Sequence, residues 1–251
     1  MSLFNDGNLT TSEDLRAVES AILDVASTEG IELDKKLQVA TREIGARITE
    51  FLLDNGDNPA RARDLQNVVV TEPLRDWHIA HTLAVIFRDA YSSQLNDRYA
   101  AKCAEYERRA REAARRLFAI GVGLSSDPVP GAELPQCGTA NGGVLPARNY
   151  AVQVCWQSAS ARTGGLSEPV VVHVAAGQLL TVKAMKAPEV AAGWNVYVGY
   201  QGGDVVKQNA SAIAPGATWI MPVDGLSDSS TGQHQEQVPD SYVMRNRIFR
   251  G

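Results

Sequence analysis

The chain has 251 residues, of which 44% are hydrophobic and 21% are charged, and its net charge is −5. This composition is ordinary for a globular protein of one or two domains. The net negative charge argues against non-specific nucleic-acid binding, because strong phosphate binders usually carry an excess of basic residues. No apolar run approaches the roughly 18 residues of a membrane span. The N-terminal stretch MSLFNDGNLTTSED has no basic region followed by an apolar core, so we expect no signal peptide.

Two amphipathic helices are predicted in the first 55 residues. Thr10 and Glu13 have the spacing of a capping box, which predicts one helix that ends at Gly30. Asp34 can cap a second helix, which ends before Asn55. The apolar residues that recur at helical spacing in this region are Leu15, Val18, Ile22, Val25, Leu37, Ala40, Ile44, Ile48 and Phe51.

The stretch from Thr71 to Gly121 predicts two long antiparallel helices joined by a very short turn. Thr71 can cap the first of them, and Asn96 or Asp97 can cap the second. The two expected apolar stripes are Leu74, Trp77, Ala80, Ala84, Phe87 and Tyr91, and then Tyr99, Cys103, Tyr106, Ala110, Ala113, Leu117 and Ile120. Residues 1–125 are therefore predicted to form a four-helix bundle.

The pattern changes after residue 125. Prolines and glycines replace the helical periodicity over residues 126–148, which indicates a linker. From Asn149 onward the apolar period becomes two, which is typical of half-buried strands. The strand candidates are 149–157, 168–174, 179–184, 194–200, 205–208 and 218–221.

We therefore expect a segregated α+β protein. Its predicted parts are the helical domain at 1–125, the linker, a small antiparallel β-sandwich at 149–226, and a flexible segment with a C-terminal tail at 227–251. Alternation also predicts that Trp156, Trp194 and Trp219 are buried.

The sequence does not point to an enzyme. His78 and His81 are three residues apart on a predicted helix, but no third metal ligand has a suitable spacing, so packing is favoured over a metal site. No nucleophile elbow, phosphate-binding loop or dinucleotide turn is present, and we expect no cofactor. The cysteines Cys103, Cys137 and Cys155 are expected to be free thiols; a Cys137–Cys155 disulfide is the less favoured alternative.

Two basic segments are candidates for binding. The first is a set of arginines on the last predicted helix, namely Arg108, Arg109, Arg111, Arg115 and Arg116. They either complement the helix dipole as solvated charges or pair with an acidic neighbour or partner across an interface. The second is the tail, whose candidate contact residues are Tyr242, Arg245, Arg247, Ile248 and Phe249. An aromatic segment with arginines is typical of an interface that orders on binding, and a last strand of the sandwich is the equal alternative.

Two blocks of the sequence resemble known phage proteins. LDKKLQVATREIGARITEFLL, followed by VVVTEPLRDWHIAHTLAVIFRDAYSSQLNDRYAAK, resembles the helical head-to-tail adaptor (connector) proteins of tailed bacteriophages. YAVQVCWQSASARTGGLSEPVVVHV, with GWNVYVG and AIAPGATWIMP, resembles an immunoglobulin-like or fibronectin-type-III-like decoration module of phages.

The resemblance implies a structural virion protein of the phage neck, made in the cytoplasm of the host bacterium. Such adaptors form a ring, usually a dodecamer, that docks on the portal protein, extends the DNA channel and provides the platform for tail or neck proteins. The family's portal-gripping element is often the C-terminal segment, which makes the tail residues named above the candidates here. A net acidic subunit would let viral DNA pass through the lumen without sticking. The alternative is an oligomeric binding module whose β domain recognises a glycan or a host surface.

Overall fold

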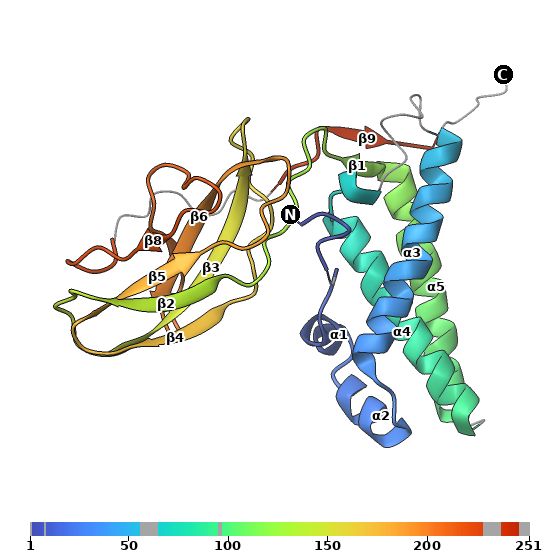
Figure 1. Ribbon diagram of the computed structural model, residues 1–251. Helices are drawn as coiled ribbons and strands as arrows, with labels where there is room; N and C mark the ends of the chain where they lie inside the picture. The colour runs from blue at the N-terminus through green and yellow to red at the C-terminus, as the bar shows by residue number, and fades with distance from the viewer. Residues whose placement is uncertain (1, 8, 56–64, 95–96, 228–236, 246–251) are drawn as a thin grey trace. The chain divides into compact units, whose positions relative to one another are not determined.

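The protein is described by a computed structural model that covers residues 2–7, 9–55, 65–94, 97–227 and 237–245 (Figure 1). The chain divides into two compact units. The helical unit comprises Phe4–Ser126 and Pro239–Gly251, and the β unit comprises Met1–Leu3 and Asp127–Val238. The predicted order, with helices first and antiparallel strands after them, is confirmed.

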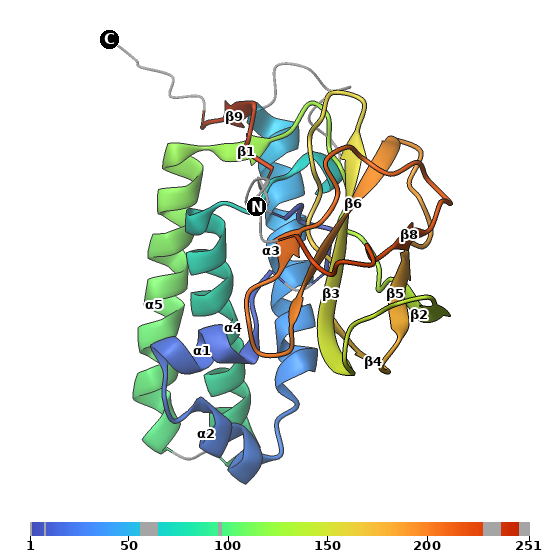
Figure 2. The same cartoon turned by 90° about the vertical axis from the view of Figure 1, so that its left-hand side faces the viewer.

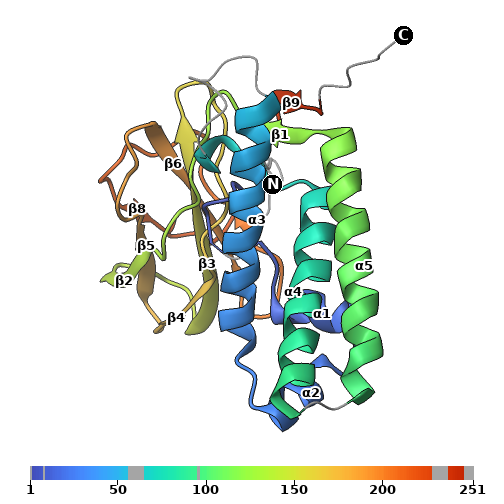
Figure 3. The ribbon, with the colours of Figure 1, turned by 90° about the vertical axis from the view of Figure 1, so that its right-hand side faces the viewer.

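Five α-helices are present in the described part of the helical unit, so the prediction of four was wrong. They are α1 (Ser12–Val18), α2 (Ile22–Glu29), α3 (Leu33–Asn55), α4 (Glu72–Gln94) and α5 (Asp97–Ile120), and a short 3-10 helix η1 spans Leu65–Asn67. The three long helices lie side by side, and α4 packs on both α3 and α5 (Figures 2 and 3).

The first predicted helix is interrupted at Glu19, because this residue bonds to α5. Glu19 has an extended backbone and ends α1, and its carboxylate accepts hydrogen bonds from Lys102 Nζ at 2.6 Å and Tyr106 Oη at 2.9 Å on α5. The capping box is also shifted by one residue. It is formed by Thr11 and Asp14, because the Thr10 hydroxyl is buried and is engaged elsewhere.

The apolar stripes of the long helices fill two core clusters. One cluster joins the C-terminal halves of α3 and α5 to the start of α4, with Ile48, Trp77 and Leu117 at its centre. The other joins α1 and α2 to the α4–α5 hairpin through Leu15, Phe87 and Tyr106, and the last two rings stack with centroids 5.5 Å apart. Full burial of these large side chains contributes about 1.5–3 kcal/mol for each one.

A two-stranded sheet closes one end of the helical unit. Strand β1 (Val122–Leu124) follows α5 directly and pairs antiparallel with β9 (Ser241–Val243), near the C-terminal end of the described chain (Figure 1). The Asp240 carboxylate fixes this pairing by accepting bonds from both the N–H and the hydroxyl of Ser126, each at 2.7 Å. The sequence offered the alternative that the tail adds a strand to the sandwich. The tail does form a strand, but this strand pairs with β1 in the helical unit, so its expected location was wrong.

The β unit contains two antiparallel sheets. Its strands are β2 (Gln136–Asn141), β3 (Arg148–Ser158), β4 (Val170–Val174), β5 (Gln178–Lys183), β6 (Ala191–Tyr200), β7 (Val206–Lys207) and β8 (Trp219–Ile220). One sheet has the order β2-β5-β8 and the other the order β4-β3-β6-β7. Side chains of both sheets, including Trp156, Leu180 and Trp194, belong to one hydrophobic cluster.

All six predicted strands are present, and the structure adds a strand to the β unit that the sequence did not indicate, as it adds β1 to the helical unit. Strand β2 lies inside residues 126–148, which were predicted as a linker, and pairs with β5 from Gln136↔Lys183 to Asn141↔Gln178. Its alternating residues are small or polar, so no apolar period marks it. Trp156 and Trp194 are buried as predicted, whereas Trp219 is only half-buried. No helix in the described ranges is long and apolar enough to cross a membrane.

Candidate interaction site

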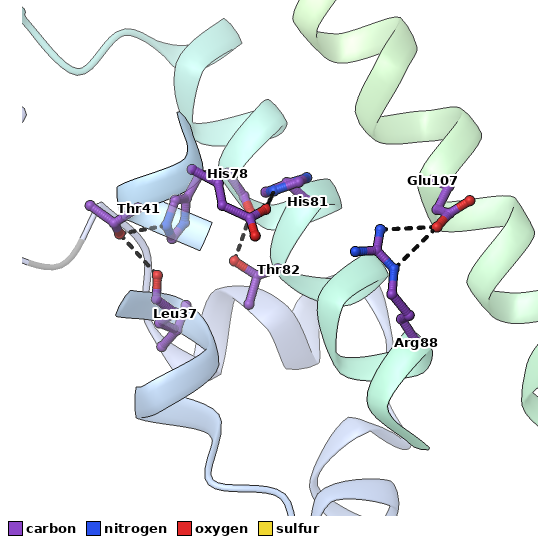
Figure 4. Close-up of polar contacts among 8 residues, drawn as sticks. Leu37, Thr41, His78, His81, Thr82, Arg88 and Glu107 are labelled. Atoms are coloured by element: carbon purple, nitrogen blue, oxygen red, sulfur yellow. Dashed lines mark hydrogen bonds and ion pairs between the residues drawn. The ribbon is translucent and has the colours of Figure 1, made fainter. Parts of the chain in front are cut away.

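The helical unit holds a buried polar layer where α3 and α4 meet (Figure 4), and Thr10 of the N-terminal segment joins it. His78 is fully buried, with Nδ1 2.7 Å from Thr10 Oγ1 and Nε2 2.9 Å from Thr41 Oγ1. The Thr41 hydroxyl donates its proton to the Leu37 carbonyl at 2.9 Å. Nε2 must therefore carry the imidazole proton and donate it to Thr41, while Nδ1 accepts from Thr10. Both nitrogens of a neutral ring are satisfied, and burial lowers the pKa of His78 to about 4.

His81 does not share a ligand with His78. Its Nε2 lies 2.6 Å from Glu43 Oε2 on α3. Within the described ranges, no group of three His, Cys, Asp or Glu residues could hold a metal ion. The two histidines thus cross-link α4 to its neighbours through separate partners.

The cysteines are all free thiols. Burial raises the pKa of the Cys137 thiol to about 11 and also raises the pKa of Cys155. A thiol with a raised pKa is a poor nucleophile at neutral pH. The raised pKa values therefore keep these thiols protonated at neutral pH.

Two further ion pairs hold the helices in register. Arg88 on α4 donates to Glu107 Oε1 on α5 from Nη2 at 3.0 Å and from Nε at 3.3 Å (Figure 4). Glu19 makes the bonds to α5 described above. Burial raises its pKa, but the hydrogen bonds from Lys102 and Tyr106 outweigh this and leave the pKa below its usual value. The α1–α4–α5 arrangement is therefore cross-linked by charge as well as packed by apolar contacts.

The five candidate arginines of α5 are exposed, but they do not form one patch. Arg108 pairs with Glu112 at 2.8 Å, and Arg109 pairs with Glu105 at 2.6 Å, in both cases along the same helix. Arg109 also lies 5.3 Å above the Tyr106 ring and, with Arg116, lines a smaller groove of about 330 Å³ between α1, α4 and α5.

Arg111 and Arg115 lie on the other flank of α5, where they line a larger groove between α3 and α5. We call this the arginine groove. Its volume is about 860 Å³, and its lining residues are Arg47, Glu50, Phe51, Asp54, Asn55, Arg111, Ala114, Arg115, Phe118, Ala119 and Arg245. All of them belong to the helical unit.

The floor of the arginine groove is aromatic. Phe51 of α3 stacks on Phe118 of α5 with centroids 4.4 Å apart, and Trp77 of α4 meets Phe118 edge-on at 5.5 Å. Such aromatic pairs contribute about 0.5–1.5 kcal/mol beyond their buried area. These contacts tie the apolar surface of the groove to the core of the helical unit.

The rim of the arginine groove is cationic. Its lining includes four guanidinium groups, those of Arg47, Arg111, Arg115 and Arg245, and two carboxylates, those of Glu50 and Asp54. Among the residues that the structure describes, none of these four guanidinium groups forms an ion pair. Arginine combined with aromatic surface is characteristic of protein interfaces, since the guanidinium binds carboxylates with paired hydrogen bonds.

The tail residues are placed only in part. Tyr242 lies in β9 with 47% of its surface exposed, and Arg245 contributes to the arginine groove while its backbone N–H reaches the Phe118 carbonyl at 3.4 Å. Arg247, Ile248 and Phe249 lie outside the described residues. The structure thus brings one tail candidate and two helix candidates to the same groove, a grouping that the sequence did not indicate.

The sequence missed the α3 side of this groove. Arg47 and Phe51 were not candidates, because a single arginine on a helix has no distinctive spacing. The i, i+4 spacing of Arg111 and Arg115 was the available signal, since such residues share one helix face. A comparison of the sequence with protein-family models gives no match, and neither does a comparison with curated proteins.

Proposed function

We propose that this protein is a structural subunit of a bacteriophage neck. In this proposal, copies of the chain form a ring of twelve between the portal protein above and tail or neck proteins below. Viral DNA passes through the ring without sequence-specific binding. The protein has no enzymatic role and acts in the virion.

The proposal depends on the position of the adaptor-like sequence within the fold. Its two blocks, residues 33–53 and 68–102, correspond to most of α3, all of α4 and the start of α5. These helices pack against one another in a single cross-linked unit. A stiff helical wedge can meet its neighbour through two different faces, and such heterologous contacts close into a ring when the rotation fits.

The β unit fits a decoration module in the same proposal. We interpret its two sheets, which share one hydrophobic core, as the immunoglobulin-like sandwich that the sequence suggests. The competing glycan-binding function needs exposed aromatic faces for stacking. Trp156 and Trp194 are buried, Trp219 is half-buried, and the exposed Tyr200 ring is covered by the Arg148 guanidinium at 4.7 Å. This arrangement favours the neck function over the binding module.

The tail is the proposed portal contact. Removal of residues 242–251 is expected to weaken co-assembly with the portal protein, but it also removes most of β9. Removal of 246–251 alone keeps β9 and separates a direct contact from a loss of local structure. If the chain without 242–251 co-assembled with portal as well as the full chain does, the tail would have no part in docking.

The proposed function as a whole is tested by particles that lack this polypeptide. They should fill with DNA but fail to retain it or to join tails. Electron microscopy of the purified protein, alone and with portal, should show a ring whose axis continues the portal channel. Particles that keep their genome and join tails normally without this chain would refute the proposal.

A further inference from the structure

The arginine groove has the properties of a docking site for a short acidic helix. One turn of α-helix is about 10–12 Å across and 5.4 Å long, or on the order of 500 Å³. A groove of about 860 Å³ therefore accepts one face of a helix of about two turns. The aromatic floor would bury an apolar side chain, and the cationic rim would pair with carboxylates beside it.

The same chain carries an element with the matching chemistry. Helix α2 has eight residues, or about two turns. Its outer face presents Leu23, which is 42% exposed, next to the exposed carboxylate of Asp24. Asp24 forms no ion pair with any residue that the structure describes. Two small hydroxyl residues, Ser27 and Thr28, continue this face and allow a close approach.

The surroundings of α2 strengthen the charge match. Residues 12–34 contain seven carboxylates and a single basic residue, Arg16. Some of these carboxylates pair within the same copy, as Glu19 does with Lys102 and Glu32 with Lys35, whereas Asp24 remains available to a neighbour. This acidic end lies at the opposite end of the long helices from β1 and β9, and the arginine groove lies at the end nearest β9 (Figures 1 and 3). The two surfaces therefore cannot meet within one helical unit, but they can meet between two copies.

We infer that the arginine groove of one copy binds α2 of the next copy in the ring. Leu23 enters the groove over Phe51 and Phe118, and Asp24 pairs with Arg111 and Arg115. The contact is heterologous, because each copy offers a groove on one side and an α2 on the other. This inference rests on the ring proposed above and names the surfaces that would build it.

Other occupants match the groove less well. The chain's own end beyond Arg245 contains Arg247 and Arg250, so it would bring positive charge to a positive rim. A nucleic-acid backbone carries a negative charge at every nucleotide and would bring several phosphates to the carboxylates of Glu50 and Asp54, whereas α2 presents one exposed carboxylate, that of Asp24. The two carboxylates of the groove can accept hydrogen bonds from the hydroxyls of α2.

The test uses charge reversal on each side of the contact in the full-length chain. Arg111→Glu with Arg115→Glu reverses the groove, and Asp24→Arg reverses α2. Each variant alone should raise the concentration needed for half-assembly at least tenfold, measured by light scattering after size exclusion. A control matched to the groove variant, Arg42→Glu with Lys183→Glu, also replaces two cations with two carboxylates, but outside both surfaces, and should assemble like wild type.

Mixing the two non-assembling variants gives the decisive result. The reversed groove of one now faces the reversed α2 of the other, and the remaining surfaces are unchanged, so alternating rings should form and assembly should return. Circular dichroism of each variant checks that it is folded. Failure of the mixture to assemble would overturn the α2 contact, and so would normal assembly of either reversed variant.

These outcomes separate the inference from the proposed function. If wild-type rings form and charge reversal leaves them intact, the contact is wrong but the ring stands. If wild-type protein remains monomeric both alone and with portal, both proposals fall.

Discussion

Replacing His78 with glutamine should reduce the acid sensitivity of the helical unit. The buried ring is satisfied as a neutral imidazole, with Nε2 donating to Thr41 and Nδ1 accepting from Thr10. Protonation would place a charge at a fully buried position, and burial is the main reason that the pKa of His78 is lowered.

The magnitude follows from the difference between the folded and unfolded states. The pKa of His78 is about 4 in the folded protein and 6.5 in an unfolded chain. Each pKa unit corresponds to about 1.4 kcal/mol, so the full effect is about 3 kcal/mol. Below pH 6.5 the unfolded state binds the extra proton, so the free energy of unfolding is highest above 6.5 and falls progressively as the pH drops to 4.

The assay is chemical denaturation followed by far-ultraviolet circular dichroism, which reports mainly on the helices. Stability is measured above pH 6.5 and again at pH 4. His78→Gln should be less stable than wild type at the higher pH, because at least one buried hydrogen bond is lost. Its further loss on acidification should be about 3 kcal/mol smaller than that of wild type.

A control on the β unit separates this effect from general acid unfolding. His173 is exposed on β4 and bonded to Asn149, so His173→Gln should retain the acid sensitivity of wild type. If His78→Gln loses as much stability between the two pH values as wild type does, a buried neutral histidine is not the cause.

Two further substitutions test the other tertiary links of the helical unit. Gly123→Ala should weaken the β1–β9 pairing by about 1–3 kcal/mol, because the new methyl group would lie 2.7 Å from the Pro239 ring. Faster hydrogen exchange of the β1 amides would show it, and Gly203→Ala, whose methyl group meets only a carbonyl at 3.5 Å, should have little effect. Glu19→Gln should lower the free energy of unfolding by about 1–2 kcal/mol, because it replaces charge-assisted bonds to α5 with a neutral amide. Glu13→Gln is the exposed control on the same helix, and equal melting temperatures for the two variants would contradict this account.

The sequence by itself determined the helices and strands that have a clear apolar period. The stripe from Leu37 to Phe51 is buried along α3 as predicted, and the alternation of Tyr150, Val152, Val154 and Trp156 gives β3 its buried face. A period of 3.6 or 2 reports which face of an element leaves water, and that information is local.

The tertiary structure decided the features that depend on partners distant in sequence. Glu19 ends α1 in order to bond α5, and β9 forms only because β1 offers it an edge more than 100 residues earlier. Strand β2 has no apolar period and exists because β5 pairs with it. None of these outcomes is encoded in a local window.

The candidate site shows the same division. Composition and spacing identified the arginines of α5, but not which of them are free to bind. Folding pairs Arg108 and Arg109 with glutamates on their own helix and brings Arg111 and Arg115 beside Arg47 and two stacked phenylalanines. The charges are present in the sequence, whereas the groove forms only when two helices pack side by side. That packing places the charged side chains around one binding surface.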